Sequence, residues 1–478
     1  MEDILTRWLG QTAVIRTDLL AVFGVLISLG VSLHILMRKR VVGSAIGWTG
    51  LVWLSPVFGT ALYLTFGLNR VERRARKLKR RPSVQYDETP QAPAAVPEAY
   101  APLDRAVRAI TGLPTVAGTG ITMFRNGDEA YPAMLEAIHG ARRSVALSSY
   151  IFLDDDIGKT FIAALKAAKD RGCEVRVILD GIGSGYFYPA AWRRLRNLGV
   201  PAGLFMHSVL PWRMPFLNLR THKKLLILDG RVAFTGGVNI SDGNRVATKP
   251  EFPIRDTHFR IEGPVVEQLA QAFIVDWAFV SGEDLEGEAW MPRLSPAGDL
   301  TARVVTSGPD ADIEKIATVV LQAIACARSS IRLTTPYFLP NDLIVSALCL
   351  AATRGIEVDV VIPRKSDHPI VDWATRAHIE PLLESGVRIW LDEPPFDHSK
   401  ALSIDREWCF VGSANWDSRS FRLNFELNVE VYDAALARRL DAFISEKCET
   451  RLTQADLDAR PHLVRLRDAA VRLLLPYL

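Results

Sequence analysis

One pattern of His, Lys and Asp occurs twice in the chain and constrains its fold more than any other feature. Residues 222–229 read His-Lys-Lys-Leu-Leu-Ile-Leu-Asp and residues 398–405 read His-Ser-Lys-Ala-Leu-Ser-Ile-Asp, so both follow H-x-K-x4-D. Each copy precedes a turn of small residues that ends in Asn, at 235–239 and 411–415. Two copies with matching tails predict an internal duplication.

The motif suits a β-strand, whose successive side chains point to opposite faces. His222 and Lys224 then share one face, as do His398 and Lys400. An imidazole beside an ammonium group suits a phosphate, because the imidazole can attack phosphorus while the ammonium holds its oxygens. The alternative, two basic edge strands with buried histidines, is disfavoured by the duplication.

The turns after the motifs are expected to complete a phosphate site. Gly237 and Ser413 would bring backbone N–H groups close to the anion, and Asn239 and Asn415 would add side-chain amides.

Four carboxylates accompany the motifs. Asp229 and Asp405 complete the predicted catalytic set, although their position at a strand end favours capping of the following turn over contact with substrate. Asp256 and Glu426 each begin a later apolar strand and could orient an imidazole through its other nitrogen; a surface position is the alternative.

The paired motif resembles that of the phospholipase D superfamily, and most closely that of its bacterial cardiolipin synthases. The resemblance includes residues 222–239, 412–420 and 423–426 and an apolar N-terminus, and it covers nearly the whole chain. It implies that one motif from each half meets the other at a shared active site. It also implies that His222 is the nucleophile and His398 the acid, an order that the residues alone leave open.

From about residue 103 the chain repeats itself. Ala-Arg-Arg-Ser-Val at 141–145 and Ala-Arg-Ser-Ser-Ile at 327–331 each lead to a Tyr-containing segment, then to a helical pattern ending in Arg-Gly and an apolar strand. Alternating helical and strand periods predict an α/β fold. We expect two phospholipase D-like halves, 103–297 and 298–478, the second with a C-terminal helix.

The N-terminal 70 residues are expected to anchor the chain in a membrane. Residues 19–37 carry no formal charge and would span about 28 Å as a helix. A second charge-free stretch, 41–69, is rich in glycine and contains Pro56, which is expected to kink or break it. It is interpreted as a second span, making the protein multi-pass, or as a re-entrant or interfacial segment.

Residues 71–102 are expected to form a basic run followed by a Pro-rich linker. The dense Lys and Arg residues between 70 and 81 favour a cytoplasmic location for the catalytic part. If both apolar stretches spanned the membrane, the smaller basic triplet Arg38-Lys39-Arg40 would lie outside, which the same rule disfavours. The run either attracts anionic lipid head groups or is a plain topology signal.

Composition limits the function classes. A hydrophobic content of 49% is high for a soluble protein, and a net charge of +3 is too small to indicate nucleic acid. The five cysteines show no paired spacing, which indicates neither disulfides nor zinc. No metal is expected, because no carboxylate cluster suits a two-metal site, and no cofactor is expected.

Several other residues are weighed as minor candidates. An apolar stripe at 462–475 is expected to pack on the core, with a membrane as the alternative. Candidates for the substrate pocket are His258, His368, Arg419 and Asn424. Ordinary packing or a membrane interface accounts better for His34, His139 and His378.

If the motifs meet, one His attacks phosphorus and forms a covalent adduct, while the other protonates the leaving alkoxide and later deprotonates the incoming hydroxyl. The leading hypothesis is a membrane phosphatidyltransferase of the bacterial inner membrane that makes cardiolipin and glycerol from two phosphatidylglycerol molecules. The alternatives, in order, are a phospholipase D that releases phosphatidic acid, a nuclease of the superfamily, and a catalytically silent scaffold.

Overall fold

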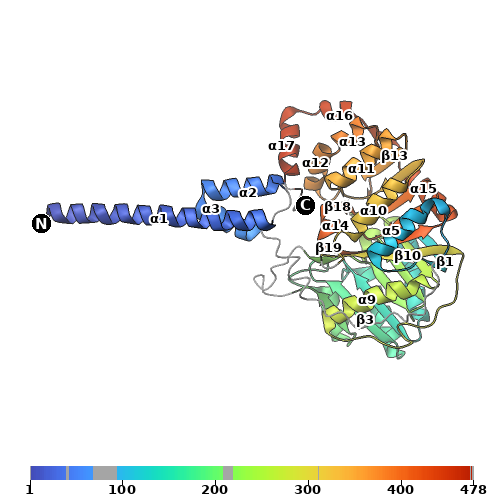
Figure 1. The fold of residues 1–478 in the computed structure, drawn as a ribbon. Helices are drawn as coiled ribbons and strands as arrows, with labels where there is room; N and C mark the ends of the chain where they lie inside the picture. The colour runs from blue at the N-terminus through green and yellow to red at the C-terminus, as the bar shows by residue number, and fades with distance from the viewer. Residues whose placement is uncertain are drawn as a thin grey trace. The chain divides into compact units, whose positions relative to one another are not determined.

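The computed structural model describes residues 2–38, 42–67, 94–207, 219–309, 312–473 and 475. The chain divides into two compact units, residues 1–77 and 78–478, which we describe separately (Figure 1). The predicted basic run and most of the predicted linker lie outside the described residues, as do Lys39 and Arg40 of the basic triplet.

The N-terminal unit contains one long helix, α1 (Glu2–Arg38). Among the described residues, only its segment Ala21–Arg38 is long and apolar enough to cross a membrane. The second apolar stretch is broken into α2 (Val42–Leu54), α3 (Pro56–Leu62) and the π-helical turn η1 (Tyr63–Gly67). The predicted break at Pro56 is confirmed. The multi-pass prediction is not supported, because α2 would be only about 20 Å long.

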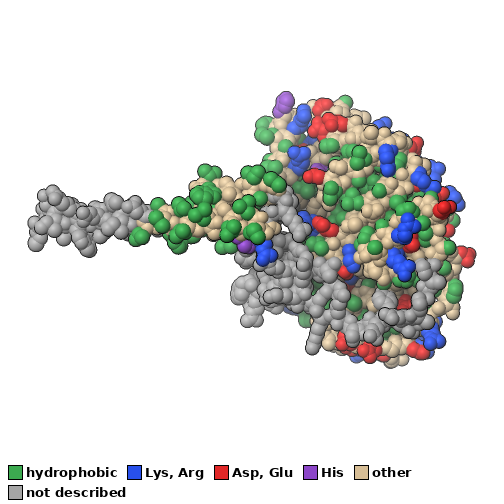
Figure 2. Space-filling view, viewed as in Figure 1, with side chains coloured by type: hydrophobic (Ala, Val, Ile, Leu, Met, Phe, Trp, Pro, Cys, Tyr) green, Lys and Arg blue, Asp and Glu red, His purple; other side chains and the backbone are tan. Residues whose placement is uncertain are grey.

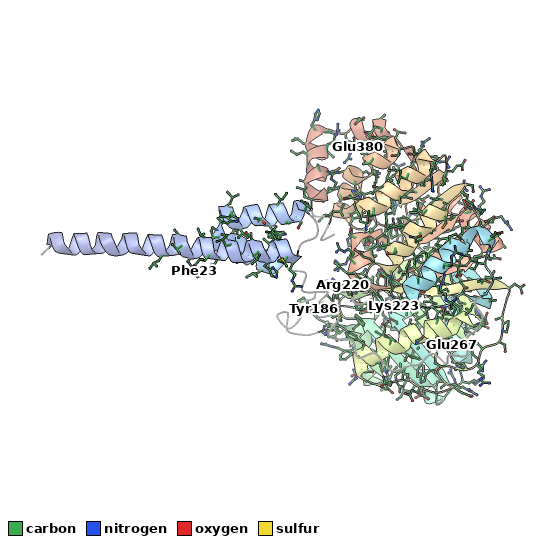
Figure 3. The ribbon with its side chains drawn as sticks, in the orientation of Figure 1. Phe23, Tyr186, Arg220, Lys223, Glu267 and Glu380 are labelled. Atoms are coloured by element: carbon green, nitrogen blue, oxygen red, sulfur yellow. The ribbon has the colours of Figure 1, made fainter. Side chains whose placement is uncertain are left out.

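Polar side chains fasten the short helices to α1. The Ser28 hydroxyl donates to the Val52 carbonyl at 3.2 Å, and the Trp53 indole donates to Ser32 at 3.1 Å. Gly59 allows the close approach of α3 to α2, since a Cβ there would lie 2.4 Å from the Leu51 carbonyl oxygen. Other side chains of α1 remain exposed, such as Phe23, which is labelled in Figure 3.

The second unit is built on one mixed sheet, which has sixteen strands among the described residues. The elements of its first half are β1 (Val116–Arg125), α6 (Asn126–Gly140), β2 (Ser144–Ser149), α7 (Asp156–Asp170), β3 (Glu174–Asp180), α8 (Ala190–Asn197), β4 (Ala202–Phe205), β5 (Arg220–Thr221), β6 (Leu225–Leu228), β7 (Val232–Gly236), η4 (Asp242–Asn244), η5 (Val246–Thr248), β8 (Ile254–Arg255), β9 (Thr257–Glu262) and α9 (Val265–Ser281).

The second half repeats this order and adds elements at its end. They are β10 (Leu300–Ser307), α10 (Lys315–Cys326), β11 (Ser330–Thr334), β12 (Phe338–Leu339), α11 (Asp342–Thr353), β13 (Glu357–Pro363), α12 (Pro369–His378), α13 (Glu380–Glu384), β14 (Arg388–Asp392), β15 (Phe396–Asp397), β16 (Ala401–Ile404), β17 (Trp408–Gly412), β18 (Trp416–Asp417), α14 (Ser418–Arg422), β19 (Asn424–Tyr432), α15 (Ala434–Ser445), β20 (Thr450–Leu452), α16 (Gln454–Asp458) and α17 (His462–Arg472).

The strand order shows the duplication directly. It runs β1-β9-β7-β6-β2-β3-β4 in one half and β10-β19-β17-β16-β11-β13-β14 in the other, followed by the edge strand β20. The halves join where β1 pairs antiparallel with β10, with Val116 opposite Ala302. The predicted α/β fold with two similar halves is confirmed, and Figure 1 shows the halves as a cyan-to-yellow group and an orange-to-red group.

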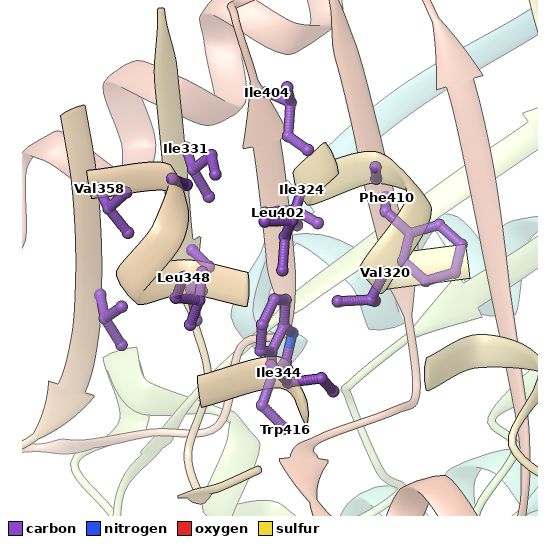
Figure 4. Packing of buried hydrophobic residues seen from close by; sticks show 14 of the residues in the cluster. Val320, Ile324, Ile331, Ile344, Leu348, Val358, Leu402, Ile404, Phe410 and Trp416 are labelled. Atoms are coloured by element: carbon purple, nitrogen blue, oxygen red, sulfur yellow. The ribbon is translucent and has the colours of Figure 1, made fainter. Parts of the chain in front are cut away.

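Helices α10 and α11 cover the sheet of the second half with apolar side chains. Figure 4 shows Val320, Ile344 and Leu348 facing strand residues such as Leu402 and Phe410, all within one buried cluster. The short helices η2 (Glu98–Tyr100) and α5 (Ala101–Thr111) belong to the same cluster through Tyr100, Leu103 and Val107. The predicted boundary at 103 therefore needs correction, because α5 packs with the second half rather than the first.

Local sequence signals explain where many helices begin. The side chains of Asp155, Asn341 and Asp433 each accept a hydrogen bond from a backbone N–H in the first turn of α7, α11 and α15. Such caps satisfy donors that have no partner inside the helix.

The C-terminal helix α17 departs from the expectation of core packing. Leu463 and Leu466, which define the predicted apolar stripe, are 80% and 66% exposed. Leu474, also assigned to the stripe, lies outside the described residues.

Candidate active site

Two short strands cross between the halves and carry the motif histidines with them. β5 pairs in parallel with the start of β19, placing Thr221 opposite Phe425, and β15 pairs in parallel with β8. The backbone N–H of His222 therefore donates to the Phe425 carbonyl at 2.9 Å, and that of His398 donates to the Arg255 carbonyl at 2.7 Å. Each histidine is held by the half to which it does not belong.

The two imidazoles meet at the interface. Their ring centroids are 6.3 Å apart, with the planes at 81°. His222 Nδ1 lies 3.1 Å from the Glu426 carboxylate and 3.1 Å from the Ser413 carbonyl oxygen. His398 Nδ1 lies 2.7 Å from Asp256 Oδ2. Each carboxylate thus contacts the imidazole of the opposite half through Nδ1.

The motif histidines and lysines do not lie on a strand as expected: residues 222–224 connect β5 to β6, and residues 398–400 connect β15 to β16. Lys224 Nζ donates to the His222 carbonyl at 2.8 Å, and Lys400 Nζ makes the equivalent bond to the His398 carbonyl. Lys223 lies between His222 and Lys224 in the first motif. It points away from both and forms an ion pair with Asp276 of α9 at 2.7 Å. Figure 3 labels Lys223 near the junction of the two halves.

Burial shifts the pKa values of the whole constellation. Burial, reinforced by Lys224 and Lys400, lowers the pKa of both imidazoles well below the usual range. Burial also lowers the pKa of Lys224 to about 7 and that of Lys400 to about 8. A bound phosphate would stabilise the charged form of every one of these groups, so the site is arranged to receive an anion.

The supporting carboxylates experience the opposite effect. Burial raises the pKa of Asp256 to about 7 and that of Glu426 to about 7, against the lowering influence of the lysines. A carboxylate hydrogen-bonded to Nδ1 stabilises the imidazolium form, which the acid of the reaction requires.

The small-residue turns do not act as predicted. The N–H of Gly237 donates to the Thr257 carbonyl and the N–H of Ser413 donates to the Leu427 carbonyl, so neither is available to a phosphate. Gly237 instead makes room: a Cβ there would lie 2.0 Å from Asp256 Oδ1. The Ser413 hydroxyl donates to Glu426 at 2.5 Å. Both turns therefore position the carboxylates.

The two asparagines are buried, Asn239 at 8% and Asn415 at 5% exposed. Asn239 Oδ1 accepts from the N–H of Ile151 at 3.2 Å, next to Tyr150, whose ring centroid is 4.8 Å from that of His222. The Oδ1 of Asn415 has no hydrogen-bond partner within the described part of the chain. Its amide bonds the Asp417 carboxylate.

The motif aspartates lie apart from the histidines. Asp229 accepts from the backbone N–H groups of residues 142–144, and Asp405 accepts from those of residues 328–330. Both stand at the opposite end of their strand from the lysine and have a positive φ. These contacts fit the turn-capping role that their position at a strand end predicts; their place in the catalytic set stays a prediction.

Comparison with known proteins identifies the family. The sequence profile described as "Cardiolipin synthase, PLD-like domain" matches residues 134–277 and 320–447. The chain is 35% identical over 362 residues to cardiolipin synthase 2 of Staphylococcus epidermidis, covering 75% of this chain and 74% of the relative. It is 33% identical over 362 residues to cardiolipin synthase of Staphylococcus aureus, covering 75% and 73%. The chain belongs to the cardiolipin synthase family of phospholipase D-like proteins.

A solved structure supports the same fold. The crystal structure of phosphatidylserine synthase from Haemophilus influenzae Rd KW20 matches with a TM-score of 0.59 at 14% identity, covering 79% of this chain and all of that chain. The chain is therefore an enzyme of the cardiolipin synthase type with the phospholipase D fold, as its paired motifs predict.

Sequence reasoning did not single out the two tyrosines of this cardiolipin synthase-family site. Tyr150 packs against His222, and the ring centroid of Tyr337 lies 6.3 Å from that of His398. The Tyr337 hydroxyl donates to Asp367 at 2.6 Å. The available signal was the internal repeat, which places both tyrosines at equivalent positions after β2 and β11.

The minor candidates lie in different parts of the structure. Asn424 supports the site by donating to Glu426 at 3.0 Å. His368 lies at the rim, with its ring centroid 5.5 Å from that of Tyr337. His258 is buried on β9, where burial lowers its pKa to about 4. His378 packs as expected, with Nε2 at 2.8 Å from the Pro340 carbonyl oxygen.

Cations gather on the His222 side. Arg419 of α14 lies close enough to His222 to contribute to the lowering of its pKa. Burial raises the pKa of Tyr150, while Arg220 and Arg419 act in the opposite direction. Figure 3 labels Arg220, which lies on β5, two residues before His222.

Proposed function

We propose that this enzyme is a membrane-bound phosphatidyltransferase that converts two phosphatidylglycerol molecules to cardiolipin and glycerol through a phosphatidyl-histidine intermediate. The observation that carries the proposal is the pair of imidazoles, 6.3 Å apart and each backed by a carboxylate from the opposite half. The buried Lys224 and Lys400 supply the charge that a phosphodiester needs.

In the donor step, His222 Nε2 attacks phosphorus in line. The P–N bond forms as the P–O bond to glycerol breaks, and His398 delivers its proton to the departing alkoxide. Glycerol leaves, and His398 becomes neutral. Lys224 and Lys400 hold the non-bridging oxygens while negative charge develops on them.

In the acceptor step, the reaction runs in reverse on a new alcohol. Neutral His398 removes the proton from a glycerol hydroxyl of the second phosphatidylglycerol, whose oxygen attacks phosphorus. The P–O bond of cardiolipin forms, the P–N bond breaks and His222 is regenerated. Exclusion of water from the covalent intermediate separates this transferase from a phospholipase D.

The carboxylate distances support the division of roles. His398 Nδ1 lies closer to Asp256, at 2.7 Å, than His222 Nδ1 lies to Glu426, at 3.1 Å. A shorter hydrogen bond to a carboxylate stabilises a charged imidazole more strongly. His398 is thus the imidazole that more readily carries the proton to be delivered, and His222 is the one that more readily stays neutral, as a nucleophile must.

The proposed membrane location of the enzyme rests on its lipid substrate and on the apolar helix α1. We infer that the segment Ala21–Arg38 of α1 anchors the enzyme in the plasma membrane of a bacterium. The basic run at residues 70–81 favours a catalytic unit on the cytoplasmic side, facing anionic lipid. Its partners are phospholipids and the bilayer rather than nucleic acid.

The test uses the full chain in vesicles with labelled phosphatidylglycerol, next to His222→Ala and His398→Ala. The wild type should release cardiolipin and equimolar glycerol, and both variants should lose turnover. Wild-type enzyme denatured in alkaline detergent during turnover should carry a phosphatidyl adduct on His222, detected by mass spectrometry, because the P–N bond survives in base; His222→Ala should carry none. His139→Ala, an exposed helix position, serves as the control.

Other outcomes assign other functions. Phosphatidic acid as the main product would make the enzyme a hydrolase with the same nucleophile. An adduct on His398 in the His222→Ala variant would reverse the two roles. Absence of any lipid turnover with an intact fold would reject the transferase.

A further inference from the structure

Helix α17 presents its leucines to solvent, while Val464, Asp468 and Val471 are its less exposed residues. Leu463, Leu466 and Leu473 are 80%, 66% and 76% exposed, whereas Asp468 is only 1% exposed. The leucines recur at helical spacing, and Ala470 lies among them on the exposed side. This arrangement is the reverse of that expected for a helix packed on a core.

Polar contacts, not the leucines, hold α17 in this orientation. Asp468 forms ion pairs with Arg460 and, at 2.7 Å, with Arg467. The Arg467 guanidinium lies over the Trp373 ring of α12 at 4.0 Å, and Arg472 donates to the Ala377 carbonyl at 3.0 Å. These contacts fix the helix on α12, so the outward leucines are a defined feature of the fold.

Arginines border the exposed leucines on both sides. Arg465 and Arg467 follow Leu463 and Leu466 around opposite flanks of the helix, with side chains 44% and 41% exposed. Apolar residues flanked by arginines are typical of helices that lie in the interface of an anionic bilayer. Figure 2 shows hydrophobic and basic side chains together at this edge of the catalytic unit, where Figure 1 places α17.

We propose that α17 is an interfacial helix that inserts its leucines into the head-group boundary of an anionic membrane. The proposal rests on the proposed function for the choice of lipid as occupant, and it adds a second membrane contact that is separate from α1. Charge complementarity between the arginines and anionic head groups favours this occupant over a second copy of the chain.

The position of α17 links this contact to the active site. α12, on which it rests, begins at Pro369, directly after the loop that holds Asp367. Asp367 accepts from Tyr337, the ring that lies beside His398. Insertion of α17 therefore brings the His398 rim of the site to the lipid surface, where Ile370, 47% exposed, adds apolar area.

Hydrogen exchange followed by mass spectrometry tests the contact without requiring turnover. The full chain is reconstituted in phosphatidylcholine vesicles with and without phosphatidylserine, so that α1 anchors it in both. We expect amides of residues 462–473 to exchange roughly tenfold more slowly in the anionic vesicles. A double variant, Leu463→Gln with Leu466→Gln, should lose this protection.

A matched variant controls for the loss of exposed leucine in general. Leu343 and Leu350 of α11 are 67% and 65% exposed, and their double change to Gln should leave the exchange of residues 462–473 as in the wild type. In surface-dilution kinetics, the α17 variant should raise the apparent KM for the mole fraction of phosphatidylglycerol roughly fivefold, with kcat unchanged. Circular dichroism verifies the fold of both variants.

Three results would overturn the proposal. The first is equal exchange of amides 462–473 in both vesicle types, and the second is unchanged protection of these amides in the Leu463→Gln, Leu466→Gln variant. The third is protection without lipid that rises with protein concentration, which would indicate that a second copy of the chain covers the helix. Because exchange is measured without a substrate, protection of α17 in an enzyme that makes no cardiolipin would reject the proposed function and leave the interfacial helix standing.

Discussion

Nδ1 of His398 lies 2.7 Å from Oδ2 of Asp256, and the two residues belong to different halves of the duplicated chain. The equivalent contact of His222 is with Glu426, again across the interface. A single half therefore contains neither complete imidazole–carboxylate pair. Each half thus supplies the carboxylate that contacts the imidazole of the other half.

Asp256→Asn should lower kcat by about 100- to 10,000-fold, because an amide in place of the carboxylate favours the wrong imidazole tautomer. Lipid binding and the fold should persist, so the KM for phosphatidylglycerol and the circular dichroism spectrum serve as checks. Asp170→Asn, whose side chain is 56% exposed, is the control. Near-normal turnover of Asp256→Asn would reject the orienting role.

Gly237→Ala should reduce kcat at least about tenfold, because the added methyl group must displace Asp256 and misplace His398. Turnover in vesicles measures the effect. Gly140→Ala places its methyl group in open space and should remain fully active. If both variants behave alike, close packing at Gly237 is not what holds the carboxylate.

The pH profile of kcat/KM should fall on the alkaline side near pH 7 to 8. Burial lowers the pKa of Lys224 to about 7 and that of Lys400 to about 8, so their positive charge is lost as the pH rises through this range. kcat/KM should drop up to about tenfold per pH unit between the two values and about a hundredfold per unit above both. Lys224→Arg, which keeps its charge, should move the start of the limb upward; an unmoved limb would assign it to another group.

Asp229→Asn and Asp405→Asn should affect stability rather than chemistry. Each loses charge-assisted bonds to backbone N–H groups, and we expect unfolding in detergent to become easier by about 1–3 kcal/mol. Activity per folded molecule should remain within about threefold of wild type. His398→Ala should show the reverse, with lost turnover and retained stability. A large fall in kcat without loss of stability would support the place of these aspartates in the catalytic set.

Lys447→Met should destabilise the enzyme by about 3–5 kcal/mol at neutral pH, because it leaves Asp397 buried without its partner. Although burial opposes the shift, Lys447 lowers the pKa of Asp397 to about 2, below the unfolded value of about 3.9. The pair therefore stabilises the fold above pH 4, and this contribution disappears as the pH falls from about 4 to 2.

Urea unfolding of the detergent-solubilised chain at several pH values measures the destabilisation by Lys447→Met and the loss of the ion pair's contribution at low pH. Asp397→Asn together with Lys447→Met should recover part of the loss, since no unpaired charge remains. Equal acid sensitivity in wild type and Lys447→Met would show that other carboxylates control the acid limb.

Much of the site was readable from the sequence because its signals are local. Alternation along an extended chain predicts that Lys223 points away from His222 and Lys224, and Lys223 pairs with Asp276 of α9. Pro56 marks the break in the second apolar stretch for a similarly local reason, since proline cannot continue a helix across its own position. The paired motif likewise identifies the family without any structure.

Tertiary structure alone decided the contacts that join distant residues. Asp256 and Glu426 could be named as orienting groups, but their crossed partnership depends on the pairing of β5 with β19 and of β8 with β15. The outward leucines of α17 and the packing of α5 on the second half are decided in the same way. Periodicity determines which residues share a face of a helix or strand, whereas the surface that this face meets depends on how the whole chain packs.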